Sequence, residues 1–162
     1  MTMLLKRAVI VLVLAAVGLL GTATPAWADV TFFLGFSPTP KSRPVQGFAG
    51  GINMLLIGFE FDYSNTSADA TQGAPSLRTG MLNGLIMTPT KTQLYLTAGG
   101  GFYREAFTGS SATSFGTNIG GGIKVGLLGP VQLRVDYRIF NLRGNARYKN
   151  PQRVYAGLNI HF

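Results

Sequence analysis

Residues 153–162 alternate between polar and apolar side chains without a break, up to the final phenylalanine. This period of two is that of a β-strand with one apolar and one polar face. The ends of water-soluble chains are usually polar and frayed, whereas a membrane interface accommodates an aromatic side chain. The pattern therefore favours a strand whose apolar face lies in a bilayer. The apolar set is Val154, Ala156, Leu158, Ile160 and Phe162.

Residues 1–28 contain the three parts of a secretory signal peptide. Lys6 and Arg7 form a positively charged start, residues 8–20 are an apolar run, and Ala26-Trp27-Ala28 is an A-x-A-like cleavage site. The run is short for a membrane helix, and no stop-transfer pattern follows it. We therefore expect Sec-type export, a signal peptide at residues 1–28, and one further domain at residues 29–162.

Hydropathy limits how residues 29–162 can cross a membrane. They contain no apolar run of about 18 residues, the length that a transmembrane helix needs. Only a closed β-barrel remains as a spanning structure. Cysteine is absent, which excludes a disulfide scaffold and thiol chemistry. The abundant glycine and the lack of helix-period patterns are typical of β structure.

Alternation and turn residues divide this domain into eight expected strands. The strands cover residues 30–36, 46–53, 56–63, 77–87, 92–104, 114–126, 131–140 and 153–162. The connections after the odd-numbered strands are long, including residues 105–113, and those after the even-numbered strands are short. Outer-membrane barrels pair short periplasmic turns with longer external loops in this way. Residues 77–87 alternate poorly, so the faces of the fourth strand stay unassigned.

If the apolar faces contact lipid, six charged side chains point into the barrel. The third and seventh strands lie opposite each other, so the acidic residues of one can meet the arginines of the other. An eight-stranded barrel has room inside for side chains and little else. We therefore expect a compensated ion network that plugs the lumen. Its members are Glu60, Asp62, Lys124, Arg134, Asp136 and Arg138, with Lys124 beside Arg134.

The opposite orientation, a water-soluble barrel with its apolar faces inward, also satisfies the alternation. The charged side chains would then face water at no cost. A soluble barrel, however, normally carries charges on the outer face of most strands. The first, second and fifth expected strands carry almost none, which favours the membrane orientation.

Catalytic chemistry has few candidates in this chain. The single histidine, His161, is expected at the periplasmic rim, and the serines of residues 29–162 fall in or beside the expected external loops. About 25 Å of membrane would separate the two rims, far beyond the reach of a Ser–His pair. The acidic residues form no metal cluster or catalytic pair, and the glycine runs do not fit a phosphate-binding loop. We expect no enzyme activity, no cofactor and no metal.

The last expected external loop is basic. Subtracting Lys6 and Arg7 leaves twelve basic against six acidic residues, a formal charge of +6 for residues 29–162. This loop could bind the phosphate groups of lipopolysaccharide or another anionic partner, or it could be an ordinary solvated loop. No fold signal for nucleic-acid binding accompanies the charge. The basic residues are Arg143, Arg147, Lys149 and Arg153.

The tail Tyr155-Ala156-Gly157-Leu158-Asn159-Ile160-His161-Phe162 resembles the C-terminal signature of outer-membrane β-barrel proteins. There, a polar or aromatic residue is followed two positions later by glycine and then by alternating apolar residues ending in phenylalanine. The resemblance implies that the barrel-assembly machinery recognises this tail. The residues that match are Tyr155, Gly157, Ile160 and Phe162.

The strand and loop rhythm of residues 29–162 is similar to that of the small eight-stranded barrels typified by OmpX, the OmpA membrane domain and the opacity-type porin-like proteins. The resemblance implies an all-β, antiparallel, up-and-down transmembrane barrel in the outer membrane of a Gram-negative bacterium. It also implies contact with outer-membrane lipid and lipopolysaccharide, and we expect a monomer. Three functions stay open: a structural or surface-interaction role, a narrow porin-like channel, and a lipid-modifying barrel enzyme.

Overall fold

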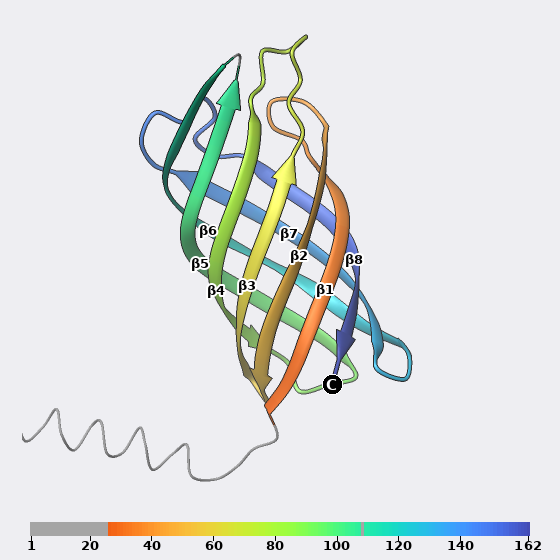
Figure 1. Cartoon of the computed structure of the whole chain (residues 1–162). Helices are drawn as coiled ribbons and strands as arrows, with labels where there is room; N and C mark the ends of the chain where they lie inside the picture. The colour runs from red at the N-terminus through yellow and green to blue at the C-terminus, as the bar shows by residue number, and fades with distance from the viewer. Residues whose placement is uncertain (1–25, 108) are drawn as a thin grey trace, which may run out of the picture.

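A computed structural model describes residues 26–107 and 109–162, which form one closed β-barrel (Figure 1). Each strand pairs antiparallel with the next in the chain, and β8 closes the barrel on β1. The expected all-β, eight-stranded, up-and-down fold is confirmed. Its strands are β1 (Ala26–Ser37), β2 (Arg43–Met54), β3 (Ile57–Thr66), β4 (Ser76–Met87), β5 (Thr92–Phe107), β6 (Ser110–Leu128), β7 (Val131–Leu142) and β8 (Gln152–His161).

Most of the expected signal peptide lies outside the described residues. Ala26, Trp27 and Ala28, the expected cleavage site, form the start of β1 and pair with the end of β2. Cleavage after Ala28 stays a prediction.

The connections at the two ends of the barrel differ in length. The end that carries the C-terminus has the short turns at residues 55–56, 88–91 and 129–130, and the opposite end carries the longer loops at residues 67–75 and 143–151 (Figure 1). The expected loop at residues 105–113 is wrong. β5 continues to Phe107 and β6 begins at Ser110, because the two strands stay paired as far as the Phe107–Ser110 partners.

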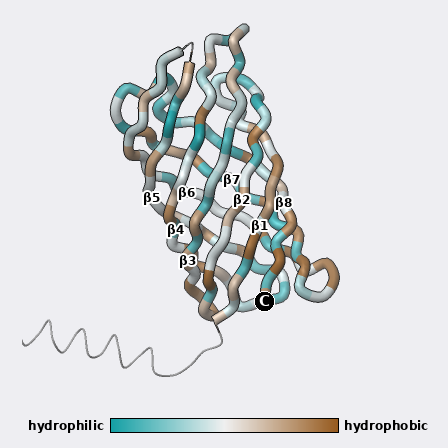
Figure 2. Tube along the Cα trace, in the orientation of Figure 1, coloured by the Kyte–Doolittle hydropathy of each residue, from teal (hydrophilic) through white to brown (hydrophobic). Residues whose placement is uncertain are grey.

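The outer wall is apolar and the charges face inward. Leu34 on β1 is 70% exposed and Leu96 on β5 is 71% exposed, whereas Arg134 on β7 is fully buried. Figure 2 shows the same alternation of hydrophobic and hydrophilic residues along individual strands. In water such a wall would be strongly unfavourable, and in a bilayer it contacts acyl chains. The membrane orientation is therefore confirmed, and the alternative of a water-soluble barrel with its apolar faces inward is wrong.

The structure assigns the faces of β4, the strand that the sequence left open. Its interior face carries Leu77, Met81, Leu85 and Met87, with the polar Thr79 and Asn83 between them. Leu82 and Ile86 face outward. Apolar residues on both faces explain why no alternation was visible in residues 77–87.

The interior is layered along the barrel. Leu77, Met81, Tyr103, Phe140, Leu142 and Ala146 form an apolar cluster. A second cluster contains Leu85, Met87 and Tyr95. The charged residues of β3, β6 and β7 lie in the same interior, buried beside these clusters. In residues 26–107 and 109–162, no helix has the length and apolarity required to cross a bilayer.

Candidate functional site: the charged interior of the barrel

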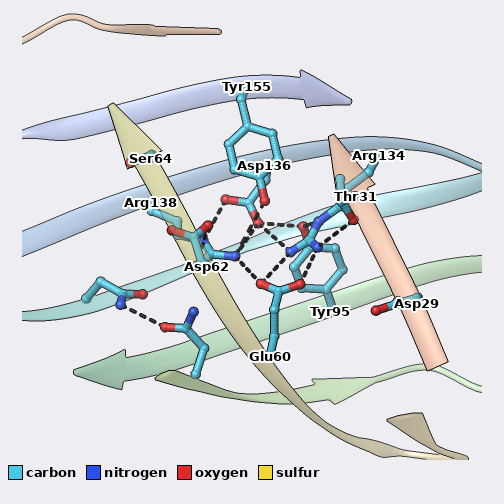
Figure 3. A network of polar contacts seen from close by, with 12 residues as sticks. Asp29, Thr31, Glu60, Asp62, Ser64, Tyr95, Arg134, Asp136, Arg138 and Tyr155 are labelled. Carbon is cyan, nitrogen blue, oxygen red and sulfur yellow. Dashed lines mark hydrogen bonds and ion pairs between the residues drawn. The ribbon is translucent and has the colours of Figure 1, made fainter. Parts of the chain in front are cut away.

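Glu60 on β3 lies at the centre of the interior network (Figure 3). Arg134 of β7 donates from Nη1 to Glu60 Oε2 and from Nη2 to Oε1 at 3.1 Å. Arg138 donates from Nη2 to the same Oε1 at 2.8 Å. One carboxylate therefore holds two guanidinium groups from the opposite wall, which is the contact that the sequence predicted between the third and seventh strands.

Asp136 completes this group from between the two arginines on β7. Its carboxylate accepts from Arg138 Nε at 2.9 Å and from Arg134 Nη2 at 3.2 Å. The inward period of β7 places three consecutive interior side chains of alternating charge on one strand. Each guanidinium consequently lies between two carboxylates, and charge-assisted bonds of this kind are the stronger class of hydrogen bond.

Two tyrosines belong to the network although the sequence did not assign them to it; Tyr155 was selected only as part of the tail signature. Tyr95 donates to Asp136 Oδ2 at 2.5 Å and accepts from Arg134 Nε at 2.7 Å. Tyr155 stacks on Phe33 with ring centroids 4.0 Å apart, and Arg134 lies over its ring at 5.7 Å. Their inward parity on β5 and β8 was visible in the sequence. The expected network contained only charged residues and therefore omitted these two tyrosines.

Arg153 was expected in an external loop, and the structure places it inside the barrel, where it is 2% exposed. It is the second residue of β8 and donates to Asp62 Oδ2 at 2.8 Å and to Ser64 Oγ at 2.6 Å. Arg138 also approaches Asp62 at 3.5 Å. The loop assignment failed because Arg153 follows the basic residues of that loop, although it is also the first residue of the alternating tail. The inward carboxylate that it neutralises is distant in the chain.

Lys124 on β6 pairs with Arg134 in register, as expected, but its ion-pair partner is Asp29. Asn53 of β2 donates to the same carboxylate oxygen at 2.8 Å. Asp29 was identified only as the expected first residue of the mature chain. Its parity, opposite to that of the apolar Phe32, Leu34 and Phe36, was the signal that could have identified it.

The charges of the ion-paired network balance. The buried carboxylates are Asp29, Glu60, Asp62 and Asp136, and the cations that pair with them are Lys124, Arg134, Arg138 and Arg153. Four charges of each sign leave no net charge in the network. Buried ions are tolerated when they are paired and hydrogen-bonded in this way.

Glycines on the wall provide space for the large side chains. A Cβ at Gly122 would lie 2.5 Å from the Tyr95 hydroxyl, and one at Gly120 would lie 2.7 Å from Arg138 Cγ. Both glycines face inward on β6. The backbone of β6 therefore forms the surface against which Tyr95 and Arg138 pack.

The two mouths of the barrel differ. At the loop end, Arg43 is buried and donates to three backbone carbonyls, those of Pro75 at 2.5 Å, Thr39 at 2.9 Å and Ser67 at 3.3 Å. Arg43 therefore ties two loops across this mouth. At the other end, a hollow of about 400 Å³ opens beneath the Asp29 carboxylate, and Trp27, Gln132 and His161 are among its lining residues.

The other expected contact residues lie outside the network. Arg143, Arg147 and Lys149 are exposed in the loop at residues 143–151. In the tail, Gly157 faces Phe33, while Ile160 and Phe162 are exposed on the outer wall. Recognition of the tail by the assembly machinery stays a prediction.

Among the described residues, no three histidine, aspartate or glutamate side chains gather as a metal site requires. Nδ1 of His161 has no hydrogen-bond partner there, and the ring packs edge-on against Trp27 at 5.4 Å.

Comparison with protein-family models and with curated protein sequences finds no match. Solved structures do match. The structure is similar to Neisserial surface protein A, with a TM-score of 0.61 and 20% identity over 85% of this chain and 96% of that one. It is also similar to the N-terminal β-barrel domain of Pseudomonas aeruginosa OprF, with a TM-score of 0.62 and 14% identity over 84% of this chain and 97% of that one.

A third similar structure is the outer membrane enzyme PagL, with a TM-score of 0.53 and 12% identity over 82% of this chain and 98% of that one. At these identities the comparisons establish the fold, that of the small eight-stranded outer-membrane barrels. Because an enzyme shares it, the fold alone does not decide whether a barrel catalyses a reaction.

Proposed function

We propose that this chain, an integral β-barrel of the bacterial outer membrane, has a structural and surface-interaction role and a lumen closed to solutes. The observation that carries the proposal is the pairing of Glu60 with Arg134 and Arg138 across the barrel. Both guanidinium groups are fully buried, so their side chains occupy the middle of the interior.

A passing ion would have to displace the paired side chains in the middle of the barrel. Each guanidinium lies between two carboxylates, and separating one such pair leaves an uncompensated buried charge. The Arg43 contacts with three loop carbonyls oppose entry at the external mouth. Both features favour a closed barrel over the porin-like alternative.

Planar-bilayer recording tests this proposal. The purified wild-type barrel should insert without discrete conductance steps. The double variant R134A/R138A, which removes two large side chains from the middle of the interior, should show such steps and so demonstrate that the assay detects an open lumen. Steps in the wild-type protein that Arg134→Gln abolishes would favour the narrow channel instead.

The surface-interaction role rests on the exposed external loops. Lys41, Arg143, Arg147 and Lys149 are exposed there, whereas the loop at residues 67–75 contributes the half-buried Asp69. This excess of positive charge favours anionic groups beyond the bilayer, such as the phosphorylated sugars of lipopolysaccharide. Binding of purified lipopolysaccharide that carries its core sugars should weaken in R147Q/K149Q, whereas Lys91→Gln, which removes one positive charge from a periplasmic turn, should bind as wild type does.

We further propose that the barrel is not a lipid-modifying enzyme, although it shares its fold with one. The support is the isolation of His161, whose Nδ1 has no partner among the described residues. Overproduction should leave the lipid A profile of the host unchanged. A new lipid A species that disappears with His161→Ala would refute this proposal.

A further inference from the structure

Two charged residues break the apolar outer wall. Among the described residues, the charged side chains within strands β1–β8 face the interior, with the exception of Arg78 on β4 and Arg104 on β5. Both arginines are exposed. Their shared position on the wall is unusual because a charge facing lipid is strongly disfavoured near the middle of a membrane.

Arg78 and Arg104 lie at the external edge of the apolar band. From Arg78 toward the periplasmic end, the outward residues of β4 are Gly80, Leu82, Gly84 and Ile86. On β5, the outward residues on the periplasmic side of Arg104 run from Phe102 to Leu94, and Leu94 is ten positions from Arg104. At about 3.3 Å per residue and a tilt of about 40°, ten positions rise about 25 Å, the height of the apolar band. The arginines therefore lie at the level of the outer-leaflet headgroups.

The two arginines are direct partners in the β4–β5 register. Like charges directly opposite each other on neighbouring strands repel and destabilise the pairing. Arg104 donates from Nη2 to Ser111 Oγ at 2.9 Å, and within the described part of the chain neither guanidinium forms an ion pair. An anion between the two guanidinium groups would remove the repulsion.

The outer wall directly below the pair has a shallow depression at Gly80. Gly80 lies between Tyr63 and Phe102 in register, and both neighbours carry rings. A Cβ built at Gly80 would meet only the Phe61 ring, at 3.9 Å. The missing side chain leaves a shallow site on the apolar wall, beneath Arg78 and Arg104, that a hydrocarbon chain can fill.

We propose that Arg78 and Arg104 bind the phosphate group of an outer-leaflet glycolipid and that one acyl chain of this lipid lies over Gly80. Guanidinium groups bind phosphate through paired hydrogen bonds in a fixed geometry. The site concerns the outer wall, so it is independent of the closed lumen and of the basic loops. Its occupant combines an anionic headgroup with a hydrocarbon chain, because the site consists of a charged pair and an apolar depression at Gly80.

Native mass spectrometry of the full barrel in detergent, with diphosphorylated lipid A that lacks core sugars as the probe, tests the site. R78Q/R104Q should bind this lipid about 30-fold more weakly, from about 1 kcal/mol for each lost surface charge. R147Q/K149Q removes the same charge from the loop and should change the affinity less than about threefold. Heat-modified migration on gels verifies that each variant is folded.

Further measurements distinguish the contribution of the phosphate group to binding from those of the acyl chain and of non-specific charge attraction. Dephosphorylated lipid A should bind wild type and R78Q/R104Q equally, and inorganic phosphate alone should not displace bound lipid A. Gly80→Leu should weaken binding while the arginines stay in place, and R78K/R104K should restore only part of the affinity. Equal losses in R78Q/R104Q and R147Q/K149Q, full affinity in R78Q/R104Q, or displacement by inorganic phosphate would each overturn the proposal.

Discussion

Replacing Glu60 by glutamine tests whether the interior of the barrel is dry. The substitution keeps the size of the side chain and removes the charge that holds Arg134 and Arg138. Asp136 would then be the nearest carboxylate to both guanidinium groups, at 3.2 Å from Arg134 Nη2 and 2.9 Å from Arg138 Nε. One buried positive charge would lose its compensation.

The expected loss depends on whether water reaches the ion pairs. Removing one partner of a buried pair destabilises a protein by about 3–5 kcal/mol. An exposed pair contributes only about 0.2–1 kcal/mol. Because Glu60 is 3% exposed and both arginines are fully buried, we expect Glu60→Gln to lower the free energy of unfolding by about 3 kcal/mol.

Urea unfolding of the barrel in lipid vesicles, followed by the loss of heat-modified gel migration, measures this quantity. Lys91→Gln, at an exposed turn, is the control and should change stability by less than about 0.5 kcal/mol. The double variant E60Q/R138Q should be at least about 1 kcal/mol more stable than the sum of the single effects predicts, because the two residues share one contact. A loss below about 1 kcal/mol in Glu60→Gln would refute the dry interior.

Three further substitutions or conditions have clear expected outcomes. Arg43→Ala removes the bonds to the carbonyls of Thr39, Ser67 and Pro75, so amide hydrogen exchange in residues 38–42 and 67–75 should accelerate, while exchange in β7 stays slow. Gly101→Ala would place a Cβ 2.0 Å from the Gly80 carbonyl oxygen and should prevent assembly of the heat-modifiable barrel, whereas Gly126→Ala, with no atom within 4 Å, should assemble normally. The Thr71 hydroxyl and backbone N–H groups donate to Asp69 and lower the pKa of its carboxyl group. Because the pKa is lowered, the ionised carboxylate stabilises the turn at pH values above the ordinary pKa of aspartate. This stabilisation is lost as pH falls through the pKa of the folded state, so exchange protection of Thr71 and Gln72 should persist at neutral pH and decline below about pH 4. Protection that already declines between pH 7 and 5 would contradict this assignment.

The sequence was sufficient to predict the fold in the strands where apolar residues that face lipid alternate with polar residues that face the lumen. β3 and β7 alternate cleanly, so Glu60, Asp62, Arg134, Asp136 and Arg138 could be assigned to the interior without any coordinates. The meeting of β3 with β7 followed from their opposite places in an eight-strand circuit. These predictions succeeded because a transmembrane wall tolerates few exceptions to its pattern.

The predictions failed where local composition and long-range pairing disagree. Residues 105–113 are polar and rich in small side chains, which is typical of a loop, but pairing between β5 and β6 extends almost through them. Arg153 follows a basic loop in the sequence. Its polar parity in the tail indicated an inward position, but its partners Asp62 and Ser64 are distant in the chain. Partners brought together by barrel closure leave no signal in a local window.

The apolar character of both faces of β4 has a consequence for biogenesis. Because either face could contact lipid, hydrophobicity does not choose between the two alignments that differ by one residue. Thr79 hydrogen-bonds with Ser64 of β3, and Asn83 accepts from Asn118 of β6, and both bonds exist in only one alignment. The alignment of this strand therefore depends on its contacts with β3 and β6, and T79V/N83L should yield a mixture of misaligned barrels during refolding.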